Sequence, residues 1–436
     1  MAGQTGDPVE APEVEALDDL AAREAAYERF VWDNLRRNYI GNFVHGMLGM
    51  TGFRLVNAPT FLPAYLHLVS GSNAIVGLGL ALQQVGNVIA PLFVGAKIEH
   101  RRKIMPAAVL FGSLARGAIL GMALVGWLLK GEPLVFALLI FIFLFGVFMG
   151  AQRVAFTLLM SKVVPISRRG RLQAWRNATG GLIAAALAYV AGRYLIGGNA
   201  FGNGYSTTFV LAFALTSAGL WALQVLLREP EPPTLRVQAR FRDRLRETPR
   251  LISDDKPFGL FLVGQMLATS ARIAAPFYIL YVGQQMPMNG VLLGLLSLAF
   301  LGADTVSNLL WGYLGDRAGF RIVLLLSLSL WIGSTLLLMA VHEPAAVFAA
   351  FVGLGASQAG YMMAAQTMVL EFGKREDLPM RIGLSTTAEG LTATAGPLLG
   401  GAVADLLGYD LVFGASVGLL TAALIVVIIV KDPRHR

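Results

Sequence analysis

An internal duplication at an offset of 217 residues is the feature that most constrains this chain. A charged segment at 312–321, GYLGDRAGFR, lies between two long apolar runs, and a weaker copy, GAKIEHRRK, occupies 95–103. The preceding segments align at the same offset without a gap. The aligned pairs are Pro59 with Pro276, Phe61 with Tyr278, Gly77 with Gly294, Asn87 with Asp304, Gly95 with Gly312 and Glu99 with Asp316. Since the charged segments keep the same sidedness, we expect two parallel repeats.

Composition indicates that both repeats lie in a bilayer. Hydrophobic residues make up 56% of the 436 residues, charged residues make up 14%, and the mean hydropathy of +0.63 leaves too little polar surface for a soluble protein of this length. Runs able to cross about 30 Å of hydrocarbon predict an all-α membrane protein of two pseudo-symmetric six-helix bundles. The twelve predicted helices are 40–68, 74–95, 104–129, 134–161, 172–195, 206–227, 258–284, 291–313, 321–341, 345–371, 382–407 and 411–430.

The repeat and the apolar runs divide the chain into five parts. These are an N-terminal tail at 1–38, a first bundle at 39–228, a linker at 229–257, a second bundle at 258–430 and a C-terminal tail at 431–436. The linker begins with several prolines and continues as a basic amphipathic segment. We expect this segment to lie on the anionic inner leaflet rather than to bind a calmodulin-like partner. The N-terminal tail has no signal-peptide core, and we expect it to form an interfacial helix or a frayed end.

Basic residues fix the expected orientation. Most of the 35 Lys and Arg fall in the tails, the linker and the turns on one side of the predicted spans. Because Lys and Arg are retained in cytoplasmic loops, both termini are expected in the cytoplasm of a multi-pass plasma membrane protein, in the inner membrane if the cell is bacterial. The net charge of +8 follows from this bias and does not indicate nucleic acid as a partner. The six exceptions are Arg54, Arg116, Lys130, Arg153, Arg193 and Arg272.

The charged segments resemble a known motif. The pattern G-x-L-x-D-R-x-G-x-R is similar to the signature loop between helices 2 and 3 and between helices 8 and 9 of the major facilitator superfamily of secondary transporters. The resemblance covers 40–430, and it implies two bundles that rock about a central site while these turns lock the cytoplasmic side. The gate residues that it implies are Gly312, Asp316, Arg317 and Arg321, with Gly95, Glu99 and Arg102 in the degenerate N-terminal copy.

Charged residues inside the spans indicate where a substrate binds. In the fold that the resemblance implies, helices 1, 4, 7 and 10 line the cavity, and Arg54, Arg153 and Arg272 lie on three of them. Several guanidinium groups around one cavity favour an anion, because Arg stays charged and offers a fork of donors. The alternative is that each Arg pairs with Asp304, Glu389 or a backbone carbonyl, which would leave the cavity nearly neutral.

Uncharged polar residues on the same helices complete the expected substrate site. Gln152, Gln358 and Gln366 would be unsatisfied in lipid, so they are expected to point inward, and Tyr278 is expected to contribute to the wall. The last two glutamines are eight residues apart and therefore lie on one helix face.

Two carboxylates are the candidates for proton coupling. Asp304 and Glu389 lie within predicted helices, where a carboxyl group in a poorly hydrated cavity can load and release a proton as the cavity changes sides. Asp304 stands where the first repeat has Asn87. The alternatives are a buried ion pair for Asp304 that holds helices 7 and 8 together, and a gate ion pair with a loop Arg for Glu389.

Other classes of function lack their motifs. There is no phosphate-binding loop, no Cys/His cluster for a metal and no nucleophile elbow, so the sequence predicts neither an enzyme nor a cofactor. We expect a monomeric secondary transporter of a small organic solute, an organic anion or anionic amphiphile, coupled to protons or another ion. One alternative is multidrug efflux, since 396–401 resembles the Gly-Pro signature of drug/proton antiporters, although that signature belongs in helix 5. The other is a non-transporting sensor or assembly factor with the same fold.

Overall fold

The structure is a computed structural model that describes the chain except for residues 1–10, 99–100, 233–254, 342, 373–377 and 431–436. The described residues form helices and no strand, so the predicted all-α fold is confirmed. Helix α1 (Ala11–Asp33) precedes the first bundle, called the N-half below. Its elements are α2 (Leu35–Asn57), α3 (Phe61–Ser70), α4 (Asn73–Ile98), α5 (Met105–Leu128), α6 (Gly131–Val163), α7 (Ile166–Val190), the π-helix η1 (Ala191–Ile196), the 3-10 helix η2 (Ala200–Gly202) and α8 (Gly204–Leu226).

The second bundle, called the C-half, has the same order of spans. Its elements are α10 (Lys256–Ser270), the 3-10 helix η3 (Ala271–Phe277), α11 (Tyr278–Gln285), α12 (Gly290–Ala318), α13 (Phe320–Ala340), α14 (Pro344–Met368), the 3-10 helix η4 (Val369–Glu371), α15 (Leu378–Leu407) and α16 (Tyr409–Ile429). Within the described residues, eleven helical stretches are long and apolar enough to cross a membrane. The twelfth crossing is α2 followed by α3, in which α2 is more polar than the other spans and the apolar α3 has only 10 residues.

The α-helix of two predicted spans is broken at repeat-related prolines. The prediction of a continuous helix at 40–68 was wrong, because this span is interrupted between α2 and α3. The predicted span at 258–284 is one helical stretch, Lys256–Gln285, whose middle part, η3, is a 3-10 helix. Ala58, just before Pro59, has φ −58° and ψ 139°, the extended conformation that a following proline favours. Pro276 lies inside η3, where its missing N–H cannot support an α-helical hydrogen bond. Both breaks lie at the central pocket described below.

The charged segment at 312–321 is mostly helical. Helix α12 continues to Ala318 and α13 begins at Phe320, so the predicted turn is reduced to Gly319, whose φ of 93° favours glycine. Gly312 therefore lies inside α12, and no atom lies within 4 Å of the position that a Cβ on it would take. The glycine that allows close packing is Gly315, since a Cβ there would overlap the ring of Phe320.

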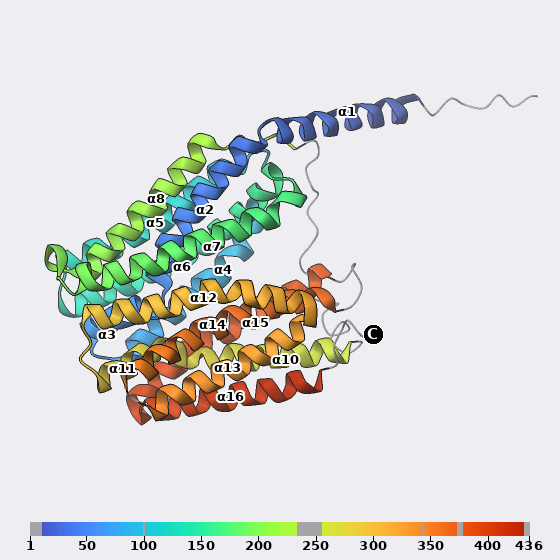
Figure 1. Ribbon diagram of the computed structural model, residues 1–436. Coiled ribbons are helices and arrows are strands. Elements are labelled where there is room, and N and C mark those ends of the chain that lie inside the picture. The colour runs from blue at the N-terminus through green and yellow to red at the C-terminus, as the bar shows by residue number, and fades with distance from the viewer. Residues whose placement is uncertain (1–10, 99–100, 233–254, 342, 373–377, 431–436) are drawn as a thin grey trace, which may run out of the picture.

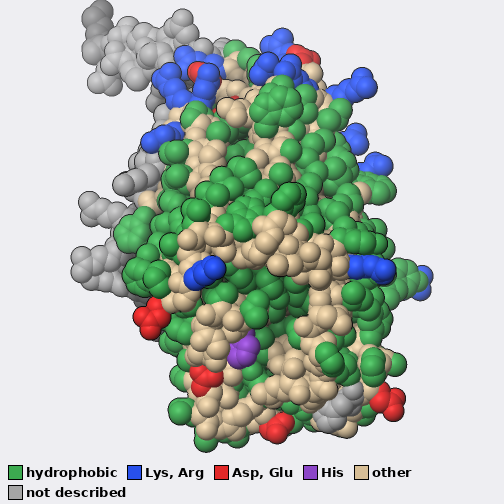
Figure 2. Space-filling view, turned by 90° about the vertical axis from the view of Figure 1, so that its left-hand side faces the viewer, with side chains coloured by type: hydrophobic (Ala, Val, Ile, Leu, Met, Phe, Trp, Pro, Cys, Tyr) green, Lys and Arg blue, Asp and Glu red, His purple; other side chains and the backbone are tan. Residues whose placement is uncertain are grey.

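The halves lie against each other along two seams. Helix α4 packs on α15, and α7 with η1 packs on α12. We call the end of the bundle that carries α1 and the C-terminus of α16 the inner end, and the opposite end the outer end. The halves converge towards the outer end, on the left of Figure 1, and diverge towards the inner end. Figure 2 faces the outer end, where few charged side chains lie over the face and basic side chains gather at the top of the view.

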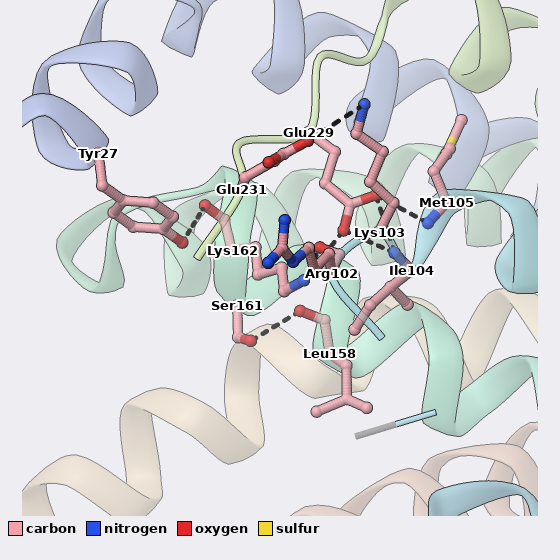
Figure 3. Close-up of polar contacts among 10 residues, drawn as sticks. All are labelled: Tyr27, Arg102, Lys103, Ile104, Met105, Leu158, Ser161, Lys162, Glu229 and Glu231. Atoms are coloured by element: carbon pink, nitrogen blue, oxygen red, sulfur yellow. Dashed lines mark hydrogen bonds and ion pairs between the residues drawn. The ribbon is translucent and has the colours of Figure 1, made fainter. Parts of the chain in front are cut away.

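The start of the linker is fixed to the inner end of the N-half (Figure 3). The Glu229 carboxylate accepts hydrogen bonds from the N–H groups of Ile104 and Met105, the shortest being 2.7 and 2.8 Å, and pairs with Lys162 Nζ at 3.1 Å. A carboxylate at a helix start is stabilising, and the Glu229 side chain is only 4% exposed. The hydroxyl of Tyr27 in α1 donates to the Lys162 carbonyl at 3.0 Å, and burial raises the pKa of Tyr27. The predicted amphipathic part of the linker lies outside the described residues.

Candidate substrate site

A central pocket lies between the halves where the first and seventh spans are broken. Its volume is about 310 Å³, and both halves line it. The break in the N-half contributes Pro59, and the break in the C-half contributes Pro276. Its polar lining residues are Arg54, Asn57, Gln83, Gln84, Arg272, Asp304 and Gln358. The predicted residues Arg54, Arg272, Asp304 and Gln358 thus come together in one site.

An ion pair joins the halves at this pocket. Arg54 Nη1 of α2 lies 2.6 Å from the Asp304 carboxylate of α12, and it also donates to Thr305 Oγ1 at 2.9 Å. Each side chain of the pair is 20% exposed, so water screens it only partly. The sequence-based alternative placed Asp304 in a pair that holds helices 7 and 8 together. In the structure its partner is instead on the first span, in the other half.

Arg272 lines the same pocket without a counter-ion in contact. It makes no hydrogen bond or ion pair with any residue that the structure describes, and it lies in η3, next to the pocket-lining break at Pro276. Glu389 of α15 is half-buried, and it does not line the pocket. No ion pair joins Arg272 and Glu389 within the described part of the chain.

Amide side chains form the uncharged wall. Gln83 Nε2 donates to Asn57 Oδ1 at 2.5 Å, which links α4 to the end of α2. Gln358 Nε2 is buried at the pocket without a hydrogen-bond partner in the described residues, so it is a donor available to a ligand. Asn57 was not among the predicted site residues. Its spacing of three residues from Arg54, on the same helix face, is the signal that could have identified it.

Four predicted substrate residues do not line this pocket. Arg153 is exposed on α6, Gln366 is exposed on α14, and Gln152 is buried with Oε1 unpartnered among the described residues. Tyr278 is fully buried among aromatic residues of the C-half. Its hydroxyl lies 3.0 Å from Thr335 Oγ1 and accepts a hydrogen bond from Trp331 Nε1 at 3.2 Å. Both hydrogen-bond partners of the Tyr278 hydroxyl therefore belong to the core of the C-half.

Arg116 is a buried charge that lies away from the pocket. It is 2% exposed and donates to the carbonyl oxygens of Gly112 at 2.6 Å and Thr216 at 2.8 Å, while its guanidinium lies over the ring of Phe53. These contacts link α5 to α8 and α2 inside the N-half. They place Arg116 in packing between helices of one half.

The gate residues of the C-half, all of them described, make no hydrogen bond or ion pair with any described residue of the N-half. Asp316 is exposed and forms no hydrogen bond or ion pair with any described residue. Arg317 lies over the ring of Tyr313 at 4.6 Å, and Arg321 donates to the carbonyl oxygens of Val427 and Ile428 at the end of α16.

In the N-terminal copy of the gate motif, the Arg102 carbonyl accepts a hydrogen bond from Lys162 Nζ at 2.9 Å. Gly95 lies within α4, and Glu99 is outside the described residues. The described hydrogen bonds and ion pairs between the halves lie at the centre and at the outer end. The described parts of the halves are therefore joined at the outer end and diverge towards the inner end (Figure 1).

Comparison with known proteins decides the family. The sequence matches the profile of the Major Facilitator Superfamily over residues 40–303 and 260–436. The chain belongs to the major facilitator superfamily. It is therefore a membrane transporter of solutes by family, as the charged motif indicated. None of the curated proteins matches the chain.

Solved structures of this superfamily share the fold. A mutant form of the nucleoside transporter NupG superposes with a TM-score of 0.72 at 13% identity, over 90% of this chain and 99% of the other. A D-xylose-proton symporter gives 0.71 at 13% identity, over 92% and 99%. The human organic anion transporter MFSD10 gives 0.59 at 16% identity, over 90% and 99%. At such low identities these similarities establish the fold and leave the substrate open.

Proposed function

We propose that this transporter carries a small organic anion by alternating access and uses protons as the coupling ion. The observation that carries the proposal is the charge arrangement in the central pocket. Arg54 is neutralised by Asp304, whereas Arg272 lines the same pocket with no counter-ion in contact among the described residues. A guanidinium offers a carboxylate or phosphate two parallel hydrogen bonds. A pocket of about 310 Å³ suits a small solute.

The ion pair supplies a route to coupling. As long as Asp304 is ionised, its carboxylate occupies a donor of Arg54. Protonation removes the negative charge, so the pair loses its attraction and Arg54 becomes free to bind an anion together with Arg272. A proton and an anion then bind in the same state, which favours symport. In the empty and unprotonated pocket the pair re-forms and again joins the two halves.

The same charges disfavour efflux of amphipathic cations. Among the described lining residues, two guanidinium groups face one carboxylate, so the pocket has an excess of positive charge. A cationic drug would meet this repulsion in a site shielded from water, where charge interactions are stronger than in bulk solvent. The pocket chemistry therefore supports the anion rather than the multidrug alternative.

Substitution of Arg272 tests the anion site. In proteoliposomes, after a thermal-shift screen of organic anions, sugars and cationic drugs has chosen the substrate, Arg272→Gln should weaken affinity about 10- to 150-fold. This is the loss of about 1.5–3 kcal/mol for one charged hydrogen bond. Arg193→Gln is the matched control, because Arg193 is exposed at the outer end and bonds Tyr189. Wild-type affinity in Arg272→Gln would remove the anion proposal.

Substitution of Asp304 tests the coupling separately. Asp304→Asn mimics the protonated carboxyl, so it should abolish uphill accumulation driven by a pH gradient while counterflow of substrate remains measurable. Both are measured in the same proteoliposomes. Full uphill accumulation by Asp304→Asn would remove Asp304 from the coupling step and leave the anion site untouched.

A further inference from the structure

One acidic residue of the C-half binds the start of a helix in the N-half. The Asp405 carboxylate, near the end of α15, accepts hydrogen bonds from Ser72 Oγ at 2.8 Å, from the N–H of Asn73 at 2.9 Å and from the N–H of Ala74 at 2.8 Å. Asn73 and Ala74 are the first two residues of α4. Asp405 thus supplies an N-terminal cap to a helix of the other half.

Helix α4 has little capping of its own. The Ser72 hydroxyl reaches the N–H of Ile75 only at 3.4 Å, and the Ser72 carbonyl reaches the N–H of Val76 at the same distance. The first N–H groups of a helix have no intrahelical partner and carry a partial positive charge. A carboxylate placed on them is therefore more stabilising than a neutral cap.

Contacts around Asp405 hold the end of α15 and the start of α16 close to α4. The hydroxyl of Tyr409 donates to Asn73 Oδ1 at 2.7 Å, and both residues are buried. A Cβ on Gly401 would overlap the Asn73 carbonyl oxygen, and one on Gly77 would overlap the carbonyl oxygen of Pro397. The backbones of α4 and α15 are therefore nearly in contact along the seam that ends at Asp405.

We propose that Asp405 is a latch that favours the state closed at the outer end, and that it thereby sets the balance between the two ends of the transport cycle. This inference rests on the alternating access of the proposed function. Rocking that separates the outer ends must pull Asp405 away from Ser72, Asn73 and Ala74, because these groups belong to different halves. Three hydrogen bonds and a charge–dipole interaction are lost in that step and made again on closure.

The test measures the conformational balance directly. Spin labels are attached to cysteines introduced in the full-length protein, whose native chain has no cysteine. The outer pair is Glu132 on α6 and Glu343 before α14, and the inner pair is Ile166 on α7 and Leu370 in η4, all of them exposed. Distance distributions are recorded by double electron–electron resonance in nanodiscs without substrate.

Loss of the latch should change the distance of the outer spin-label pair and that of the inner pair in opposite directions. In Asp405→Ala the long-distance population of the outer pair should rise and that of the inner pair should fall, with a change of about 10-fold in the ratio of the two states. Asp410→Ala is the matched control, since Asp410 is exposed at the same end and makes no hydrogen bond or ion pair with any described residue. It should leave both distributions as in the wild type.

Two other outcomes would overturn the latch. If Asp405→Ala lowers the unfolding temperature but leaves both distributions as in the wild type, the carboxylate has only a structural role. Gly192→Leu reports on the motion itself, because a side chain there would overlap the backbone of Gly290 and Gly294 when the outer end is closed. Distributions that shift in Gly192→Leu but not in Asp405→Ala would remove the latch and keep alternating access. Unchanged distributions in both would remove alternating access and the latch with it.

Discussion

The two seams that close the outer end begin at repeat-related positions but are held differently. The internal repeat aligns Ser72, before α4, with Asn289, before α12. Asn289 caps its own helix, because its Oδ1 accepts a hydrogen bond from the N–H of Leu292 at 2.8 Å. Ser72 leaves that role to Asp405 of the other half. The cap of α12 therefore lies within one half, whereas α4 has only a long cap bond of its own and gains shorter ones from the other half when the outer end is closed.

Shape closes both seams in a similar way. Gly77 of α4 and Gly294 of α12 are aligned by the repeat, and a Cβ on either would press on backbone atoms of the other half. At the α12 seam, Gly192 of the π-helix η1 lies against the backbone of Gly290. The close glycine contact is thus present at both seams. Among the described residues, a carboxylate bound to a helix start of the other half is present only at the α4–α15 seam. Electrostatic control of outer closure is assigned to the α4–α15 seam.

The largest effect is expected from blocking the shared glycine contact. Gly77→Leu should disfavour the closed outer end by about 3 kcal/mol, about 100-fold in the ratio of states, because backbone atoms cannot move aside as a flexible side chain can. Transport in proteoliposomes should fall to a similar degree. Gly117→Leu is the control, since no atom lies within 4 Å of the Cβ position at Gly117. Equal turnover in the two variants would show that the seam is not closed during transport.

A smaller effect is expected from the second polar contact of the α4 seam. Tyr409→Phe removes the hydroxyl that bonds Asn73 Oδ1, so the closed state loses about 1 kcal/mol and the ratio of states changes about 5-fold. The spin-labelled outer pair measures this change. Tyr205→Phe is the control, because the Tyr205 hydroxyl makes no hydrogen bond within the described residues. An equal response of both variants would mean that the shift does not come from the hydrogen bond to Asn73.

The sequence predicted the helices because most spans leave a long apolar run, and it predicted the duplication from the charged segments that align at a fixed offset. It also placed Arg54, Arg272 and Asp304 at the middle of spans, and these residues lie at one pocket. The pairing of Arg54 with Asp304 was one of several pairings that the sequence left open, because the way in which the halves dock decides which partners meet. The helix breaks could have been expected at Pro59 and Pro276, since each has a restricted backbone and no N–H.

Other site residues could not be placed because a helix has several faces. Arg153, like Arg54, is an arginine within a span, but its side chain is exposed on α6 and does not line the pocket. Tyr278 was expected to line the substrate site, but in the structure its buried hydroxyl forms hydrogen bonds with Thr335 and Trp331. Asp405 gave no signal in the sequence. Free N–H groups like those that it binds are present at every helix start, and docking of the halves alone selects the ones at the start of α4.

The smallest effect on the conformational balance is expected from the cap of the other seam. Asn289→Ala removes the side-chain bond to the Leu292 N–H and should lower the free energy of unfolding by about 1 kcal/mol. Because donor and acceptor belong to one half, rocking leaves the bond intact, so both spin-label distributions should stay as in the wild type. Asn289→Ser keeps a cap and should restore the stability measured by thermal denaturation. A shift in the distance distributions as large as that of Asp405→Ala would mean that caps at both seams respond to closure, and the electrostatic difference between the seams would then be lost.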